Sequence, residues 1–144
     1  DLITAFKNDE LNKDFVAVLP FPGPQQNGMP ELHRLTPTLT ILQKRGHKVA
    51  LVTDGRMSGA SGKVPSAIHV TPEARCGGVI GKIRTGDIVL VDAKNGILEF
   101  KDSAVLERSI ENKDNSTSIG TGRELFSSLR QNVSSSEEGA SFIL

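Results

Sequence analysis

Two short apolar runs stand out in the first half of the chain, Phe15–Leu19 and Val49–Val52. Both have the continuous apolar character of strands that a parallel sheet buries on both faces. An apolar stripe at helical spacing lies between them and consists of Leu32, Leu35, Leu39 and Leu42. Strand, helix and strand in this order form a βαβ unit with parallel strands. We therefore expect the segments that follow the two strands, residues 20–31 and 53–62, to meet at one edge of the sheet.

The intervening helix has clear boundary signals. Pro30 suits a first helical turn, and Glu31 beside it places a negative charge where the helix dipole favours one. Pro37 interrupts the stripe, so the helix is kinked there or restarts with Thr36 as its N-cap. Gly46 is a typical C-terminal stop.

The middle of the chain has a different pattern, in which apolar and polar residues alternate in short runs. It predicts a short strand in Ala67–Val70, a helical turn from Thr71, and then three strands separated by turn residues. These three strands are Val79–Ile83, Ile88–Val91 and Ile97–Phe100. Asn95-Gly96 is the dipeptide of a type I′ hairpin turn.

Helical and polar segments alternate in the last third. We expect a short helix in Ala104–Ile110, a polar connector over 112–118, and a helix from the capping box at Thr121 to about Val133. The tail, residues 134–144, is expected to be mobile. Parallel βα units followed by an antiparallel portion predict one mixed α/β domain over residues 1–144.

Composition narrows the functional classes. The chain has 17 basic and 17 acidic residues and 4% aromatic residues, so we expect neither nucleic acid nor a membrane as a partner. Cys76 is the single cysteine, which suits a reducing cytoplasm and cannot alone hold zinc or an iron–sulfur cluster. The sequence opens on an amphipathic run without a methionine, and we expect a fragment of a longer protein.

The loop from Gly55 to Lys63 carries the richest candidate chemistry. Its glycines allow positive φ angles and close approach of a ligand, and successive backbone N–H groups in such a turn bind anions. Ser58 and Ser61 fit neither a phosphate-binding P-loop nor a hydrolase elbow. An anionic ligand beside these serines and a purely structural turn are both open on composition alone.

Several longer stretches closely resemble the C-terminal domain of the dihydroxy-acid and phosphogluconate dehydratase family. They are Gly28–His33, Leu51–Ala74, Gly77-Gly78, Gly86–Val89 and Gly120–Phe126, and together they span most of the chain. Within the family, Ser-Gly-Ala-Ser-Gly-Lys at 58–63 is similar to the phosphogluconate branch, since other members usually carry Ser-Gly-Ala-Thr-Arg-Gly there.

The resemblance implies a swivelling β/β/α domain with a barrel-like sheet and flanking helices. Such a domain closes over an N-terminal domain of the same chain that holds the cysteine ligands of an iron–sulfur cluster, [4Fe–4S] in type. The implied reaction is the dehydration of 6-phospho-D-gluconate, a phosphorylated sugar acid, to 2-dehydro-3-deoxy-6-phosphogluconate in the Entner–Doudoroff pathway. The whole lyase is expected to be a cytoplasmic homodimer, and this chain alone is expected to be inactive.

The resemblance also implies residue roles. The family's serine base falls on Ser58, and its glutamate ligand for a divalent cation, expected to be magnesium, falls on Glu31. Arg56, Ser61 and Lys63 are candidates for binding the substrate. The structural alternatives are a helix-start charge for Glu31, solvated side chains for the two basic residues, and turn formation for the serines.

Other residues have weaker claims. Asp54 either supports the site or forms a local Asx-turn, His69 lies near the loop, and Cys76 is expected to be inert. The segment Gly120–Gly122 either begins a capped helix or binds phosphate. The alternative functions are a dehydratase of another sugar acid or dihydroxy acid, and a free-standing module that binds a phosphorylated ligand.

Overall fold

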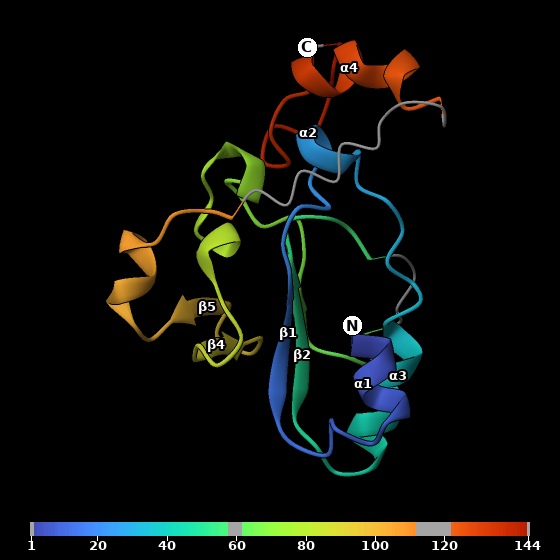
Figure 1. Cartoon of the computed structure of the whole chain (residues 1–144), viewed down its shortest axis with the longest axis vertical. Helices are drawn as coiled ribbons and strands as arrows, with labels where there is room; N and C mark the ends of the chain where they lie inside the picture. Colours follow the sequence, from blue (N-terminus) through green and yellow to red (C-terminus); the bar gives the residue numbers. More distant parts are fainter. Residues whose placement is uncertain (1, 58–61, 112–121, 144) are drawn as a thin grey trace.

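A three-stranded parallel sheet forms the centre of the computed structural model, which describes residues 2–57, 62–111 and 122–143 (Figure 1). Its strand order is β1 (Phe15–Leu19), β2 (Val49–Thr53) and β3 (Ser66–Ala67). β1 and β2 are in register from end to end. The two apolar runs of the sequence are therefore confirmed as parallel neighbours. β3 overlaps the strand expected at 67–70 only at Ala67, and that prediction is wrong for residues 68–70.

Both faces of the sheet are covered. On one face lie the helices α1 (Leu2–Lys7) and α3 (Thr36–Lys44), and the core there contains the fully buried Leu39, Leu42 and Leu51 (Figure 1). On the other face, Val52 packs with residues of two 3₁₀ helices, η1 (Ala74–Cys76) and η2 (Val79–Lys82). Because every residue of β2 is buried, this strand fixes the position of the loop that follows it.

An antiparallel hairpin completes the β structure. It consists of β4 (Val89–Asp92) and β5 (Ile97–Phe100), as the alternating pattern predicts. The prediction of a type I′ turn is wrong, because such a turn has two central residues that both have positive φ angles. Here four residues, 93–96, connect the strands, and only Gly96 among them has a positive φ, of 68°. The strand expected at Val79–Ile83 is also wrong, since these residues form η2. The fold is thus a mixed α/β domain, and the described strands do not close into a barrel.

The helices differ from expectation mainly at their starts. α3 begins at Thr36, so a restart of the helix there is confirmed, but the N-cap is Leu35 and not Thr36. A short α2 (Pro24–Asn27) was not predicted. The expected helix at 104–110 is the 3₁₀ helix η3 (Ser103–Glu107).

Near the C-terminus, η4 (Glu124–Phe126) leads into α4 (Ser127–Asn132). The capping residue Thr121 and the connector 112–118 lie outside the described residues. In the tail, the Ser134 N–H donates to the Ser141 carbonyl at 2.8 Å, and the mobility of this segment stays a prediction. Among the helices in the described part of the chain, none is long and apolar enough to cross a membrane.

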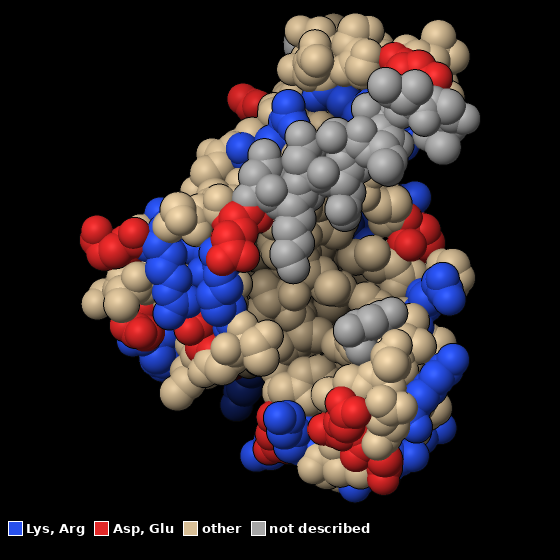
Figure 2. Space-filling view, viewed as in Figure 1, with Lys and Arg blue, Asp and Glu red and all other residues tan. Residues whose placement is uncertain are grey.

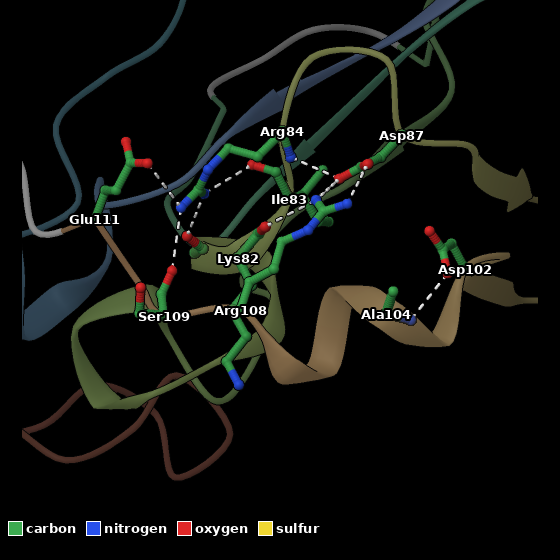
Figure 3. A network of polar contacts seen from close by, with 10 residues as sticks. Lys82, Ile83, Arg84, Asp87, Asp102, Ala104, Arg108, Ser109 and Glu111 are labelled. Carbon is green, nitrogen blue, oxygen red and sulfur yellow. Dashed lines mark hydrogen bonds and ion pairs between the residues drawn. The ribbon is translucent and has the colours of Figure 1, made fainter.

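Asp87 joins the hairpin to the two neighbouring 3₁₀ helices (Figure 3). Its carboxylate accepts hydrogen bonds from both terminal nitrogens of Arg108, at 2.5 and 3.0 Å. It also accepts one from the backbone N–H of Arg84, at 2.7 Å. The Arg84 side chain donates in turn to the carbonyls of Gly81 and Ser109. The two arginines therefore serve as structural cross-links, and the Arg108 guanidinium holds the pKa of Asp87 below its ordinary value of 3.8.

Replacing Arg108 with lysine is expected to lower the thermal midpoint of the intact protein at neutral pH, because an ammonium group cannot make the two parallel bonds. Since the folded pKa of Asp87 is lowered, the stabilisation is present above pH 3.8 and is lost as the pH falls through the folded value. The midpoint difference should therefore shrink in acid.

Arg45→Lys is the matched control, because Arg45 pairs with Asp9 at 3.0 Å with both side chains largely exposed. It is expected to change the midpoint little. Equal effects of the two substitutions would contradict a structural role that is special to Arg108.

Candidate functional site

The loops that follow β1 and β2 touch at the carboxyl edge of the sheet. The Thr53 hydroxyl donates to the carbonyl of Leu19 at 2.8 Å. Gly55 packs against Pro22 so closely that an added Cβ would lie 2.5 Å from the Pro22 Cβ. The expected meeting of the two loops is therefore confirmed for their described residues, and a side chain at position 55 would force them apart.

Glu31 lies against the second of these loops. It forms an isolated parallel bridge with Arg56, whose side chain donates from Nε to the Met29 carbonyl at 2.7 Å. Arg56 Nη1 also lies 3.5 Å from Glu31 Oε2, with 49% and 29% of the two side chains exposed. The helix-start role of Glu31 is wrong, because α3 begins only at Thr36 and residue 31 is extended.

Three non-glycine residues around these loops have left-handed backbone conformations, Phe21, Met29 and His69, with φ angles of 81°, 52° and 56°. Such conformations cost on the order of 1–3 kcal/mol each and concentrate at functional sites. His69 also donates its backbone N–H to the Gly55 carbonyl at 2.9 Å, which ties the third strand's exit to the same loop. No sequence pattern signalled these conformations.

Asp54 is fully buried beneath the loops and does not form the local turn that the sequence allows. Its Oδ2 accepts the backbone N–H groups of Phe21 at 3.1 Å and Ala74 at 2.8 Å, which are 33 and 20 residues away. Glu73, which the sequence reasoning missed, accepts the N–H of Gln25 at 3.0 Å. Burial raises the pKa of both carboxyl groups, and the charge of Asp54 raises that of Glu73 further.

The remaining candidates are less well defined. Ser58, Ser61 and most of the segment Gly120–Gly122 lie outside the described residues. Lys63 is exposed and follows Gly62, whose φ is 61°. Arg56 binds the Met29–Glu31 segment and is exposed enough to contact a ligand as well. The substrate-binding roles of Arg56, Ser61 and Lys63 stay predictions.

One carboxylate of this chain fits a metal site, but the described residues do not form a complete one. Divalent cations such as magnesium take about six oxygen ligands. In residues 2–57, 62–111 and 122–143 there is no group of three His, Cys, Asp or Glu side chains that could hold a metal ion. Glu31, partly exposed at the loop edge, fits as one carboxylate ligand in a site completed by groups from elsewhere.

Cys76 does not suit a cluster ligand. Desolvation raises the pKa of its thiol, and so does the neighbouring Glu73 carboxyl group, whereas a metal ligand must be a thiolate. Its Sγ donates to Gln25 Oε1 at 3.2 Å. Cys76 is the single cysteine of the sequence, so this chain could supply at most one of the cysteine ligands of an iron–sulfur cluster.

The charged surface gives no further indication of a site. Figure 2 shows acidic and basic side chains mixed along the sides of the visible face, around a central area with few charges, and no field of a single sign. This matches the formal net charge of zero, and the two loops therefore stand out by their geometry and not by a general attraction for anions.

Comparison with known proteins identifies the family to which this chain is similar. Residues 1–140 match the family described as dihydroxy-acid/6-phosphogluconate dehydratase C-terminal. A phosphogluconate dehydratase of Helicobacter pylori is 55% identical over 146 residues, covering 96% of this chain and 24% of that protein. One of Pseudomonas aeruginosa is 57% identical over 141 residues, covering 96% of this chain and 23% of that protein.

A dihydroxy-acid dehydratase of Methanosphaera stadtmanae is more distant, at 40% identity over 111 residues, which covers 75% of this chain and 20% of that protein. The chain thus spans about a quarter of the length of the curated phosphogluconate dehydratases it matches. The resemblance inferred from the central block of the sequence is confirmed. This chain belongs to the dihydroxy-acid/6-phosphogluconate dehydratase family and corresponds to its C-terminal domain.

Proposed function

We propose that this chain is the C-terminal domain of a 6-phosphogluconate dehydratase, a hydro-lyase that converts 6-phospho-D-gluconate to 2-dehydro-3-deoxy-6-phosphogluconate. The observation that best supports this proposal is the pairing of Glu31 with Arg56 at the start of the Gly55–Lys63 loop. Two residues of chain reach at most about 7 Å, so a ligand at Glu31 is within range of the segment that contains Ser58.

The relatives support the choice of substrate. Proteins named phosphogluconate dehydratase are 51–57% identical to this chain, against 40% for the dihydroxy-acid dehydratase. The relatives are about four times as long, which favours part of a larger enzyme over a free-standing binding module. An iron–sulfur cluster and further metal ligands belong, in this proposal, to the N-terminal part of a homodimeric cytoplasmic enzyme.

In this proposal, some catalytic groups come from this chain, and others come from the N-terminal part of the enzyme and its cofactors. The elimination removes a proton from the carbon next to the carboxylate, breaks a carbon–oxygen bond at the following carbon, and releases water and an enol that becomes the keto acid. Ser58 takes the proton, and Arg56 and Lys63 neutralise anionic groups of the substrate. A serine needs nearby positive charge and N–H donors to act as a base, and the glycine-rich loop supplies the donors.

Glu31 would hold the divalent cation, and a bound cation would supply positive charge for the substrate carboxylate and the developing enolate. A cluster held by the N-terminal part would supply Lewis acidity for the departing hydroxyl. In the proposed swivelling closure, the two loops would bring Glu31 and Ser58 to a substrate that the N-terminal part already binds.

The test is a comparison of substrates with the intact enzyme. We expect a kcat/KM for 6-phosphogluconate at least about 100-fold above that for a dihydroxy acid, because two basic side chains favour a substrate that carries a phosphate as well as a carboxylate. Ketone formation measured with each substrate gives both values. A preference for the dihydroxy acid would overturn the assignment of substrate, and activity with neither would overturn the proposed function.

A further inference from the structure

Helix α4 lies beside the loop that leads to Glu31, although core packing does not hold it there. None of its residues is buried, and its one apolar residue, Leu129, is 39% exposed. Nevertheless α4 is a neighbour of α2, the short helix after β1 (Figure 1). The Gln25 side chain of α2 donates to the carbonyl of Val133, directly after α4, at 3.1 Å. A polar contact therefore ties the C-terminal helix to this loop.

Arg130 of α4 lies at the beginning of the segment that runs from α2 to Glu31. An added Cβ on Gly28 would lie 4.0 Å from Arg130 Cδ, so the arginine side chain lies over this glycine. Gly28 ends α2, and the carbonyl of the next residue, Met29, accepts the Nε–H of Arg56 at 2.7 Å. Arg56 then pairs with Glu31. The segment 28–31 therefore has one arginine at each end.

The charge of Arg130 has no partner in the described part of the chain. Ion pairs with carboxylates occupy four other arginines, Arg45, Arg56, Arg84 and Arg108. Arg130 forms no ion pair or hydrogen bond with the residues at 2–57, 62–111 and 122–143, and it is partly exposed. A guanidinium with free donors is well suited to binding a phosphate through two parallel hydrogen bonds.

The spacing suits the proposed substrate, which carries a carboxylate at one end of a six-carbon chain and a phosphate at the other. Three residues of chain, from Gly28 to Glu31, span at most about 11 Å. The extended substrate spans roughly 9 Å from the carboxylate carbon to phosphorus, because each carbon–carbon bond is about 1.5 Å long. A substrate with its carboxylate beside Glu31 is therefore long enough to place its phosphate at Arg130.

We propose that Arg130 binds the phosphate group of the substrate, with Glu31 and Arg56 at the carboxylate end. This inference deepens the proposed function and rests on it. It also gives α4 a role that packing does not explain, because the helix carries the side chain that distinguishes a phosphorylated sugar acid from an unphosphorylated one.

The test combines a substitution in the intact enzyme with a change in the ligand. Arg130→Gln is expected to lower kcat/KM for 6-phosphogluconate by about 10- to 100-fold, mainly through KM, because charge-assisted bonds to the phosphate are lost. The inhibition constant of gluconate, which has the same carbon chain without the phosphate, should stay within about twofold. Equal weakening of both ligands would overturn the proposal, and so would an unchanged kcat/KM for 6-phosphogluconate.

Arg130→Lys adds a graded readout that does not require gluconate to inhibit. Lysine keeps the charge but cannot make two parallel bonds, so its kcat/KM for 6-phosphogluconate should lie between those of the wild type and the glutamine variant. A lysine variant as impaired as the glutamine variant would contradict binding of an anion by this side chain.

Arg34→Gln is the matched control. Arg34 lies three residues after Glu31, just as Gly28 lies three residues before it, and Arg34 is exposed. A general attraction between basic side chains and the anionic substrate would make Arg34→Gln and Arg130→Gln equally harmful, and that result would overturn the proposal. The thermal midpoints of both variants should stay near that of the wild type.

The outcomes separate this inference from the proposed function. A wild-type enzyme that does not convert 6-phosphogluconate would overturn the proposed function and this inference with it. Conversion by the wild type together with an unaffected Arg130→Gln variant would overturn this inference alone.

Discussion

Replacing Ser58 with alanine in the intact enzyme is expected to lower kcat by about 10²- to 10⁴-fold, the usual contribution of a general base. In the proposed mechanism Ser58 accepts the proton from the carbon next to the carboxylate, and alanine has no group that can do so. Binding depends on other side chains, so KM should change little. Steady-state kinetics on 6-phosphogluconate, with iron and sulfide content measured on the same samples, give the result.

Ser61→Ala is the matched control, since Ser61 lies three residues further along the same loop. If Ser61 binds substrate, its loss should raise KM and leave kcat within about tenfold of the wild type. A Ser58→Ala enzyme with near-normal kcat and normal cluster content would reject Ser58 as the base. A low kcat accompanied by loss of the cluster would point to damage at the interface between the two parts of the enzyme.

The sequence predicted the part of the site that depends on local and periodic patterns. The apolar runs of β1 and β2 identify buried parallel strands, and parallel strands joined by a helix must end at the same edge. That reasoning brought residues 20–31 and 53–62 together, and the contacts of Gly55 with Pro22 and of Glu31 with Arg56 confirm it for the described residues.

The errors arose where distant contacts override local preference. Pro30-Glu31 has the composition of a helix start, yet Arg56, 25 residues later, binds the Met29 carbonyl and keeps the segment extended. The run at 79–83 was predicted as a strand, but residues Val79–Lys82 form η2. The N-cap of η2 is Gly78, which packs on the Pro72 carbonyl so closely that no side chain would fit there. Contacts of this kind leave no periodic signal.

The buried residues Asp54 and Glu73 also depend on distant contacts that the sequence does not reveal. The sequence left two roles open for Asp54, support of the site and a local Asx-turn. Its partners are instead on the loop after β1 and on η1, and the Glu73 bond to Gln25 spans 48 residues. Only the folded structure shows that Asp54 and Glu73 both hold the loop after β1, at Phe21 and at Gln25.

Replacing Glu31 with glutamine in the intact enzyme is expected to weaken metal activation by about 100-fold or more. Glutamine preserves the size of the side chain but removes the negative charge that a divalent cation requires. Outer-shell changes at metal sites already cost about 10- to 100-fold in affinity or activity, and a direct ligand should cost at least as much. The dependence of kcat/KM on magnesium concentration measures the effect.

Arg56→Gln separates this role from the ion pair, because it breaks the same 3.5 Å contact from the other side. If Glu31 acts only through Arg56, both single variants and the double variant should lose the same activity, with an unchanged magnesium dependence. If Glu31 binds the cation, Glu31→Gln alone should shift the magnesium curve to higher concentration. Arg56→Gln should then raise KM for the substrate and leave the curve near its wild-type position, because removing the guanidinium leaves the carboxylate in place as a ligand.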